Sequence, residues 1–137
     1  MNPDTPGSAP SPSARRCVLI VDDEDSVRTV ATRMLQLSGF EVLVARDGQE
    51  GLEQFTAHGD RICIILLDMT MPRLGGEEVL ERVRLSKPHM RVILMSGYSR
   101  KDASPLIGDG KVTGFLQKPF TFAQLKEQMR VLLETNA

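Results

Sequence analysis

The chain has 137 residues, a length that suits one domain built around a single hydrophobic core. Its hydrophobic content of 41% and charged content of 26% are ordinary for a soluble globular protein. The formal net charge of −1 gives no reason to expect direct binding to nucleic acid or an anionic membrane, and no apolar run approaches the roughly 20 residues that span a bilayer.

Residues 1–14 consist mostly of Pro, Ser, Ala and Gly and carry almost no large apolar side chain. Such a segment buries too little surface to offset the entropy lost on ordering, so we predict a disordered tail or linker before a domain that covers residues 15–137. The segment also lacks the apolar stretch of a secretory signal, which leaves the cytoplasm as the default compartment.

Five short apolar runs in the rest of the chain have the length and composition of β-strands. They are rich in β-branched and aliphatic residues and several end abruptly in charge, which is typical of strands buried on both faces. Two of the runs contain the cysteines Cys17 and Cys63, for which we predict reduced thiols in the core, with a strained disulfide as the alternative. The runs occupy residues 17–21, 41–45, 61–67, 91–95 and 113–117.

Helix-like stretches lie between and after these runs. The first should begin near Asp25 or Ser26, which are good N-cap residues, and end at Gly39. A stripe of apolar residues at helical spacing marks the face that should pack on the core. The stripe comprises Val27, Val30, Ala31, Met34 and Leu35.

Three further stretches carry local start and stop signals. Asp47 can cap a second helix that stops at Gly59, and a third helix should start at Gly75 or Gly76. Thr121 should start the last helix. The third helix has Glu77 and Glu78 in its first turn, where they complement the helix dipole, and ends before Pro88.

Residues 99–110 are the weakest helix candidate. Pro105 would disrupt a regular helix, although it can occupy the first turn after Ser104. We therefore predict a fourth helix that is short, shifted or mobile.

Five β-α units in this order predict a five-stranded parallel sheet with helices on both faces. The carboxyl ends of parallel strands meet at one edge of the sheet, where sites form in open α/β folds. Asp22 and Asp23 end the first run, Asp68 ends the third and Lys118 follows the last. Clustered carboxylates repel one another unless a cation joins them, so the pattern indicates a site for a hard metal ion.

Four motifs at these strand ends have a more specific meaning. Together they resemble a two-component response-regulator receiver domain, over roughly residues 15–135. The resemblance implies an α/β, flavodoxin-like fold, in which a doubly wound sheet of strand order 2-1-3-4-5 is covered by five helices. It also implies transfer of a phosphoryl group from a phosphohistidine to an aspartate. The motifs are Val21-Asp22-Asp23-Glu24, Leu67-Asp68-Met69-Thr70-Met71-Pro72, Met95-Ser96-Gly97 and Lys118-Pro119-Phe120.

The resemblance assigns an acceptor and a metal site. Asp68 matches the phosphoacceptor, and a carboxylate is a competent nucleophile toward phosphorus. Asp22 and Asp23 match the acidic pair that binds Mg²⁺ together with Asp68, and the backbone carbonyl of Thr70 matches a further ligand. Glu24 is expected only to help start the first helix.

The resemblance also assigns residues that respond to the phosphoryl group. Lys118 matches a lysine that contacts a phosphoryl oxygen and pairs with Asp68 beforehand, and its bond to Pro119 matches one that is cis in the family. Ser96 matches a hydroxyl donor that moves toward the phosphoryl group, with Gly97 permitting close backbone approach. Phe115 matches a switch aromatic, although an ordinary core residue is an equally good interpretation.

The partner implied is a sensor histidine kinase or a phosphotransfer domain, with a homodimer on phosphorylation left open. The sequences of residues 97–99 and 114–120 resemble receivers attached to hybrid sensor histidine kinases, in which case the chain would act in a phosphorelay. Such a receiver is not an enzyme beyond self-phosphorylation and slow autodephosphorylation.

Two other classes stay open. A small aspartyl-phosphate phosphatase of the haloacid-dehalogenase type would need a second acid where this chain has Thr70. A receiver-shaped interaction module would not be phosphorylated at all. His58 and His89 lie in no phosphodonor context, and no P-loop indicates ATP binding.

Overall fold

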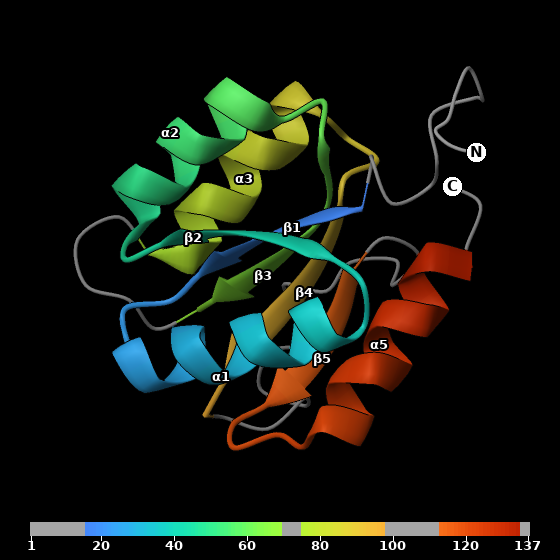
Figure 1. Ribbon diagram of the computed structural model, residues 1–137. Helices are drawn as coiled ribbons and strands as arrows, with labels where there is room; N and C mark the ends of the chain where they lie inside the picture. The colour runs from blue at the N-terminus through green and yellow to red at the C-terminus, as the bar shows by residue number, and fades with distance from the viewer. Residues whose placement is uncertain (1–15, 70–74, 98–112, 135–137) are drawn as a thin grey trace.

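The computed structural model describes residues 16–69, 75–97 and 113–134. They form a parallel sheet of five strands in the order β2-β1-β3-β4-β5, which confirms the predicted topology (Figure 1). Two strands run one residue further than predicted, so Asp68 and Ser96 are the last residues of their strands. The strands are β1 (Cys17–Val21), β2 (Glu41–Ala45), β3 (Ile62–Asp68), β4 (Arg91–Ser96) and β5 (Thr113–Gln117).

Helices cover both faces of the sheet, with α2 and α3 on one side and α1 and α5 on the other (Figure 1). None of the helices in the described ranges is long and apolar enough to cross a membrane. The predicted fourth helix at 99–110 and the predicted tail at 1–14 lie outside the described residues. The helices are α1 (Asp25–Leu37), α2 (Gly48–His58), α3 (Gly76–Ser86) and α5 (Phe122–Glu134).

The central strands are buried on both faces because successive side chains point to opposite sides of the sheet. In β1, Leu19 packs in the cluster beneath α2 and α3, whereas Ile20 packs in the cluster beneath α1 and α5. Both side chains are at most 1% exposed, and burying such a side chain stabilises the fold by about 1.5–3 kcal/mol. The uninterrupted apolar runs of the sequence therefore follow from having helices on two sides.

Several helix boundaries confirm the local signals. The Asp47 side chain accepts a hydrogen bond from the Glu50 backbone N–H at 2.8 Å. The Gln124 backbone N–H donates to the Thr121 hydroxyl at 3.1 Å, and the Thr121 backbone N–H donates to the Gln124 side chain at 2.8 Å. These two hydrogen bonds form a capping box at the start of α5. Gly39 has φ +92°, the left-handed conformation that ends a helix.

Helix α1 begins at Asp25, as predicted, but two details of the prediction are wrong. The N-cap residue is Glu24 rather than Asp25 or Ser26, and its side chain makes no cap hydrogen bond and instead accepts one from Lys118. Val30 does not belong to the buried stripe, since its side chain is 50% exposed. It lies about 100° around the helix from Ala31, which faces the sheet.

The two cysteines are free thiols, so the disulfide alternative is wrong. Cys17 is buried and Cys63 is half-buried. Burial raises the pKa of the Cys63 thiol to about 11 and also raises that of Cys17, which keeps both groups protonated at neutral pH.

The start of α3 lies against the backbone that carries Asp68. A Cβ atom added at Gly76 would overlap the Asp68 carbonyl oxygen and would lie 2.8 Å from the Met69 Cα. At Gly97, where the sequence suggested a close backbone approach, an added Cβ would meet no atom of the described residues within 4 Å. The close approach that this edge of the sheet requires is therefore at Gly76.

A Gly76→Ala substitution is expected to lower the free energy of unfolding by about 1–3 kcal/mol, because the clash is with backbone that cannot rotate away. Urea denaturation monitored by circular dichroism measures this loss. Gly97→Ala is the matched control and should unfold at nearly the wild-type urea concentration. Equal stability of the two variants would contradict the close approach.

Candidate functional site

The carboxyl ends of the strands bring three acidic side chains together. Asp22 follows β1 and Asp68 ends β3, and these strands are paired with Val21 opposite Leu67. Asp23 joins them from the same loop, and each of the three carboxylates offers an oxygen within 4.8 Å of the others. Asp22 and Asp68 are buried, whereas Asp23 is exposed.

The loop that carries Asp22 is tied down by its neighbours. Asp22 Oδ1 accepts a hydrogen bond from the Glu24 backbone N–H at 2.9 Å. Arg28, one turn into α1, donates from Nη1 to the Asp22 carbonyl oxygen at 2.7 Å and also pairs with Asp25. Arg28 was not among the predicted site residues, although an arginine one helical turn after an acidic strand end is a signal that the sequence contains.

Lys118 reaches into the acidic cluster from the opposite side. Its ammonium lies 2.8 Å from Asp22 Oδ2, 2.8 Å from Glu24 Oε1 and 3.4 Å from Asp68 Oδ2. Its backbone N–H donates to the Ser96 carbonyl oxygen at 2.7 Å, and its bond to Pro119 is cis. The structure therefore places Lys118 next to Asp68, as the resemblance implied.

The protonation of Lys118 is set by two opposing effects. Burial by itself lowers the pKa of the ammonium, but the contacts with Asp22 and Glu24 raise it further than burial lowers it. The net pKa lies above the usual value for lysine. Lys118 is therefore a permanent positive charge at neutral pH.

The surroundings of Asp22 and Asp23 disfavour ionisation of their carboxyl groups. Burial raises the pKa of Asp22, and the neighbouring Lys118 offsets part of that effect. Burial also raises the pKa of Asp23, and the adjacent Asp68 raises it further. The cluster carries more negative charge than a single ammonium balances.

The donor set fits a divalent cation. Asp22 Oδ2 is fully buried and accepts no well-aligned hydrogen bond within the part of the chain that the structure describes, although the Lys118 ammonium lies 2.8 Å from it. Three converging carboxylates, one with such an oxygen, suit a hard ion such as Mg²⁺. Thr70, the fourth ligand that the resemblance implied, lies outside the described residues.

Ser96 and Phe115 lie at the β4–β5 side of the site. Ser96 is 3% exposed at the end of β4 and pairs with Gln117 in the sheet register. Phe115 is 7% exposed, pairs with Leu94 and belongs to the core cluster beneath α2 and α3. Phe115 is thus a buried core aromatic here, and its role as a switch stays a prediction.

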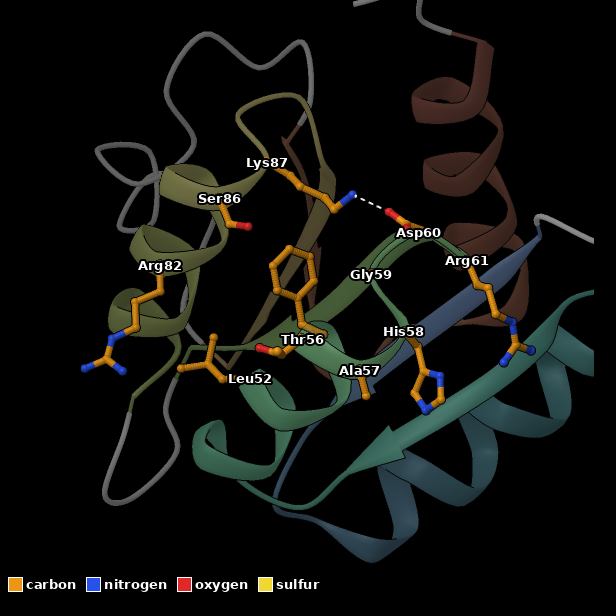
Figure 2. A pocket seen from close by; sticks show the side chains of 11 residues that line it. Leu52, Thr56, Ala57, His58, Gly59, Asp60, Arg61, Arg82, Ser86 and Lys87 are labelled. Atoms are coloured by element: carbon orange, nitrogen blue, oxygen red, sulfur yellow. Dashed lines mark hydrogen bonds and ion pairs between the residues drawn. The ribbon is translucent and has the colours of Figure 1, made fainter.

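A hollow lies at the end of the sheet opposite the acidic cluster, near the ends of α2 and α3 (Figure 2). It has a volume of about 620 Å³ and is lined by Leu52, Phe55 and His58 among others. Its charged groups are paired, as in the 3.1 Å contact between Lys87 and Asp60. It contains none of the predicted site residues, so the acidic cluster is the better candidate site.

Comparison with known proteins identifies the family of the chain. The family model described as the response regulator receiver domain matches residues 18–130. The sensor kinase CckA of Brucella abortus is 37% identical over 123 residues, which cover 89% of this chain and 13% of CckA. The response regulator MprA of Mycolicibacterium vanbaalenii is 33% identical over 118 residues, which cover 85% of this chain and 49% of MprA. The chain therefore spans half or less of the length of these relatives.

Solved structures show the same similarity. The receiver domain of the hybrid histidine kinase CckA superposes with a TM-score of 0.73 at 33% identity, covering 86% of this chain and 99% of that one. The response regulator TrrA from Thermotoga maritima, in complex with Mg²⁺-BeF, gives a TM-score of 0.74 at 33% identity. The match covers 85% of this chain and 98% of that one. The CheX-CheY-BeF₃-Mg²⁺ complex from Borrelia burgdorferi gives a TM-score of 0.79 at 27% identity. The match covers 85% of this chain and 88% of that one.

Proposed function

This chain belongs to the family of response regulator receiver domains, which are phosphoryl-accepting modules of signalling, and from that premise we propose that Asp68 is its phosphoacceptor. The observation that carries the proposal is the position of the Asp68 carboxylate. It lies at the end of a central strand, 3.4 Å from the Lys118 ammonium and beside Asp22 and Asp23.

In the proposed reaction, a carboxylate oxygen of Asp68 attacks the phosphorus of a phosphohistidine. The new O–P bond forms as the N–P bond breaks, and the imidazole leaves with the electron pair of that bond. Lys118 stabilises the negative charge on the phosphoryl oxygens, and the Ser96 hydroxyl donates a hydrogen bond to one of them. Both groups lie at the same end of the sheet as Asp68.

Asp22, Asp23 and Asp68 would hold Mg²⁺ together with the Thr70 carbonyl that the resemblance implies. The Mg²⁺ in the complexes of TrrA and CheY supports this proposal. The ion would supply positive charge that offsets the repulsion between the carboxylates and an incoming phosphoryl group. Each acid already offers a carboxylate oxygen within 4.8 Å of the other two.

An Asp23→Asn variant is expected to be slightly more stable than wild type in EDTA at neutral pH, by less than about 1 kcal/mol because water screens this exposed group. The pKa of Asp23 is raised in the folded chain, so folding favours its protonated form. Ionisation therefore costs stability, and that cost appears as pH rises from the unfolded pKa through the folded one. The advantage of the variant should shrink at acid pH, which thermal denaturation at pH 4 and pH 7.5 would measure.

Addition of Mg²⁺ should make wild type more stable than the Asp23→Asn variant, the reverse of their order in EDTA. At Mg²⁺ ten times its dissociation constant, wild type should gain about 1.4 kcal/mol and Asp23→Asn little or nothing. Glu53→Gln removes an exposed charge from α2 and serves as the control that keeps the wild-type gain. An undiminished Mg²⁺ gain in Asp23→Asn would rule out Asp23 as a ligand.

The donor and context of the receiver are also proposals. The similarity to CckA supports a receiver that works with a histidine kinase or a phosphotransfer domain, as in a hybrid kinase phosphorelay. We propose a cytoplasmic location and no direct contact with nucleic acid or membrane. We also propose that the chain can form a homodimer on phosphorylation, which light scattering would detect as a doubled mass.

The function is tested by intact-mass measurement of the wild-type chain after incubation with acetyl phosphate. One phosphoryl group should be added with Mg²⁺ present and none in EDTA, and it should be lost slowly. Repeated turnover of a generic aryl phosphate would instead support the phosphatase alternative. The absence of an adduct with any small-molecule donor would support an interaction module that is not phosphorylated.

A further inference from the structure

Lys118 has an acidic partner besides the proposed metal ligands and phosphoacceptor Asp22, Asp23 and Asp68. Glu24 Oε1 accepts a hydrogen bond from its ammonium at 2.8 Å, although the two residues lie 94 positions apart in the chain. The sequence assigned Glu24 only to the start of α1. The structure instead gives it a contact with a residue of the proposed reaction.

The backbone directs Glu24 toward Lys118. Its N–H is engaged by Asp22 Oδ1, and its side chain makes no cap hydrogen bond with α1. The carboxylate is therefore free of the helix and crosses to the loop after β5. The Lys118 backbone is fixed in turn by its hydrogen bond to the Ser96 carbonyl oxygen.

The ammonium lies nearer to Glu24 and to Asp22 than to the acceptor. Lys118 Nζ lies 2.8 Å from Glu24 Oε1 and 3.4 Å from Asp68 Oδ2. A phosphoryl group on Asp68 would offer several anionic oxygens, and the ammonium has three N–H donors to share among its acceptors. An N–H of Lys118 that is bound to Glu24 can bind a phosphoryl oxygen only after its hydrogen bond to Glu24 breaks.

We propose that Glu24 is a positioning residue that restrains the Lys118 ammonium and thereby slows phosphoryl transfer to Asp68. The inference rests on the proposed function of Asp68. Glu24 is not itself a catalytic residue, since it acts only through Lys118. Its side chain is 55% exposed, so the contact contributes little to the stability of the fold. The rate of phosphorylation is therefore the informative readout.

The test compares single-turnover rates with acetyl phosphate at saturating Mg²⁺. Glu24→Gln should be phosphorylated about three- to fivefold faster than wild type, the factor that corresponds to an exposed ion pair lost on the way to the transition state. Asp25→Asn is the matched control, because it removes the neighbouring charge, which is 92% exposed and pairs with Arg28 instead. Its rate should stay within twofold of wild type.

A second arm separates the contact with Lys118 from a general effect of charge. In a Lys118→Met background, Glu24→Gln should no longer change the rate, since the residue that it restrains is gone. Equal rates for Glu24→Gln and wild type would overturn the role of Glu24 while leaving phosphorylation of Asp68 intact. Acceleration in Asp25→Asn, or an undiminished effect in Lys118→Met, would also overturn it. A wild-type chain that takes up no phosphoryl group would contradict both this inference and the proposed function.

Discussion

An Asp68→Asn chain is expected to keep its unmodified mass after incubation with acetyl phosphate and Mg²⁺, under conditions in which wild type gains one phosphoryl group. The amide oxygen of asparagine carries no full negative charge and is a poor nucleophile toward phosphorus. Asn has nearly the same shape as Asp, and residue 68 is 1% exposed, so the substitution changes the charge with little change in packing. The expected loss of labelling is therefore complete rather than partial.

Stability measurements distinguish this loss from misfolding. Asp68 lies with Asp22 and Asp23 in a group of like charges, so neutralising it should not lower the melting temperature in EDTA. Asp60→Asn is the control, because Asp60 is an exposed aspartate that pairs with Lys87 far from the site, and this variant should be labelled like wild type. An adduct on the Asp68→Asn chain would place the phosphoacceptor elsewhere.

A Lys118→Met variant is expected to show two large effects. Phosphorylation by acetyl phosphate should slow by about 10²- to 10³-fold, the usual cost of removing one group that stabilises transition-state charge. In EDTA the free energy of unfolding should also fall, by up to about 3–5 kcal/mol, because Asp22 is fully buried and would lose its cation. The methionine keeps the length of the side chain, so the lost charge is the main change.

Mg²⁺ and pH should both modify the stability loss in Lys118→Met. Mg²⁺ should restore part of it, since a bound ion would supply positive charge to the same carboxylates. Burial already raises the pKa of Asp22, and loss of the ammonium should raise it further. The loss should therefore shrink as pH falls and Asp22 becomes protonated.

Lys126→Met is the control for this variant. Lys126 is an exposed lysine on α5 whose ammonium lies over the Phe122 ring, so both its labelling rate and its stability should stay near wild type. A Lys118→Met protein that is as stable in EDTA as wild type would mean that Asp22 does not depend on this ion pair.

Local features of the fold were readable from the sequence because they depend on near neighbours. The caps at Asp47 and Thr121 form hydrogen bonds to groups three residues away, and both were predicted. The left-handed backbone at Gly39 was likewise signalled by the residue itself. The N-cap of α1 is the exception, because Glu24 occupies that position without a side-chain cap and its carboxylate binds Lys118, a residue distant in sequence.

The neighbouring acids Asp22 and Asp23 show what a motif leaves undecided. In sequence they are alike, yet in the fold one is 0% exposed and the other is exposed. Side chains at the end of a strand alternate in direction, and only packing of helices on the sheet determines which of the two is covered. Asp22, the buried one of the two, is the one that forms an ion pair with Lys118.

The sequence by itself determined the order of strands and helices and the presence of acids and a lysine at strand ends, since apolar periodicity and abrupt charge are local properties of the chain. The tertiary structure alone decided which atoms meet. The parallel register sets Asp22 beside Asp68, and the Lys118 side chain from the loop after β5 reaches Asp22 and Glu24 although β3 and β4 lie between β1 and β5 in the sheet. Contacts such as Glu24 with Lys118 join residues whose distance in space is set by the packing of the whole sheet, and no local pattern encodes that distance.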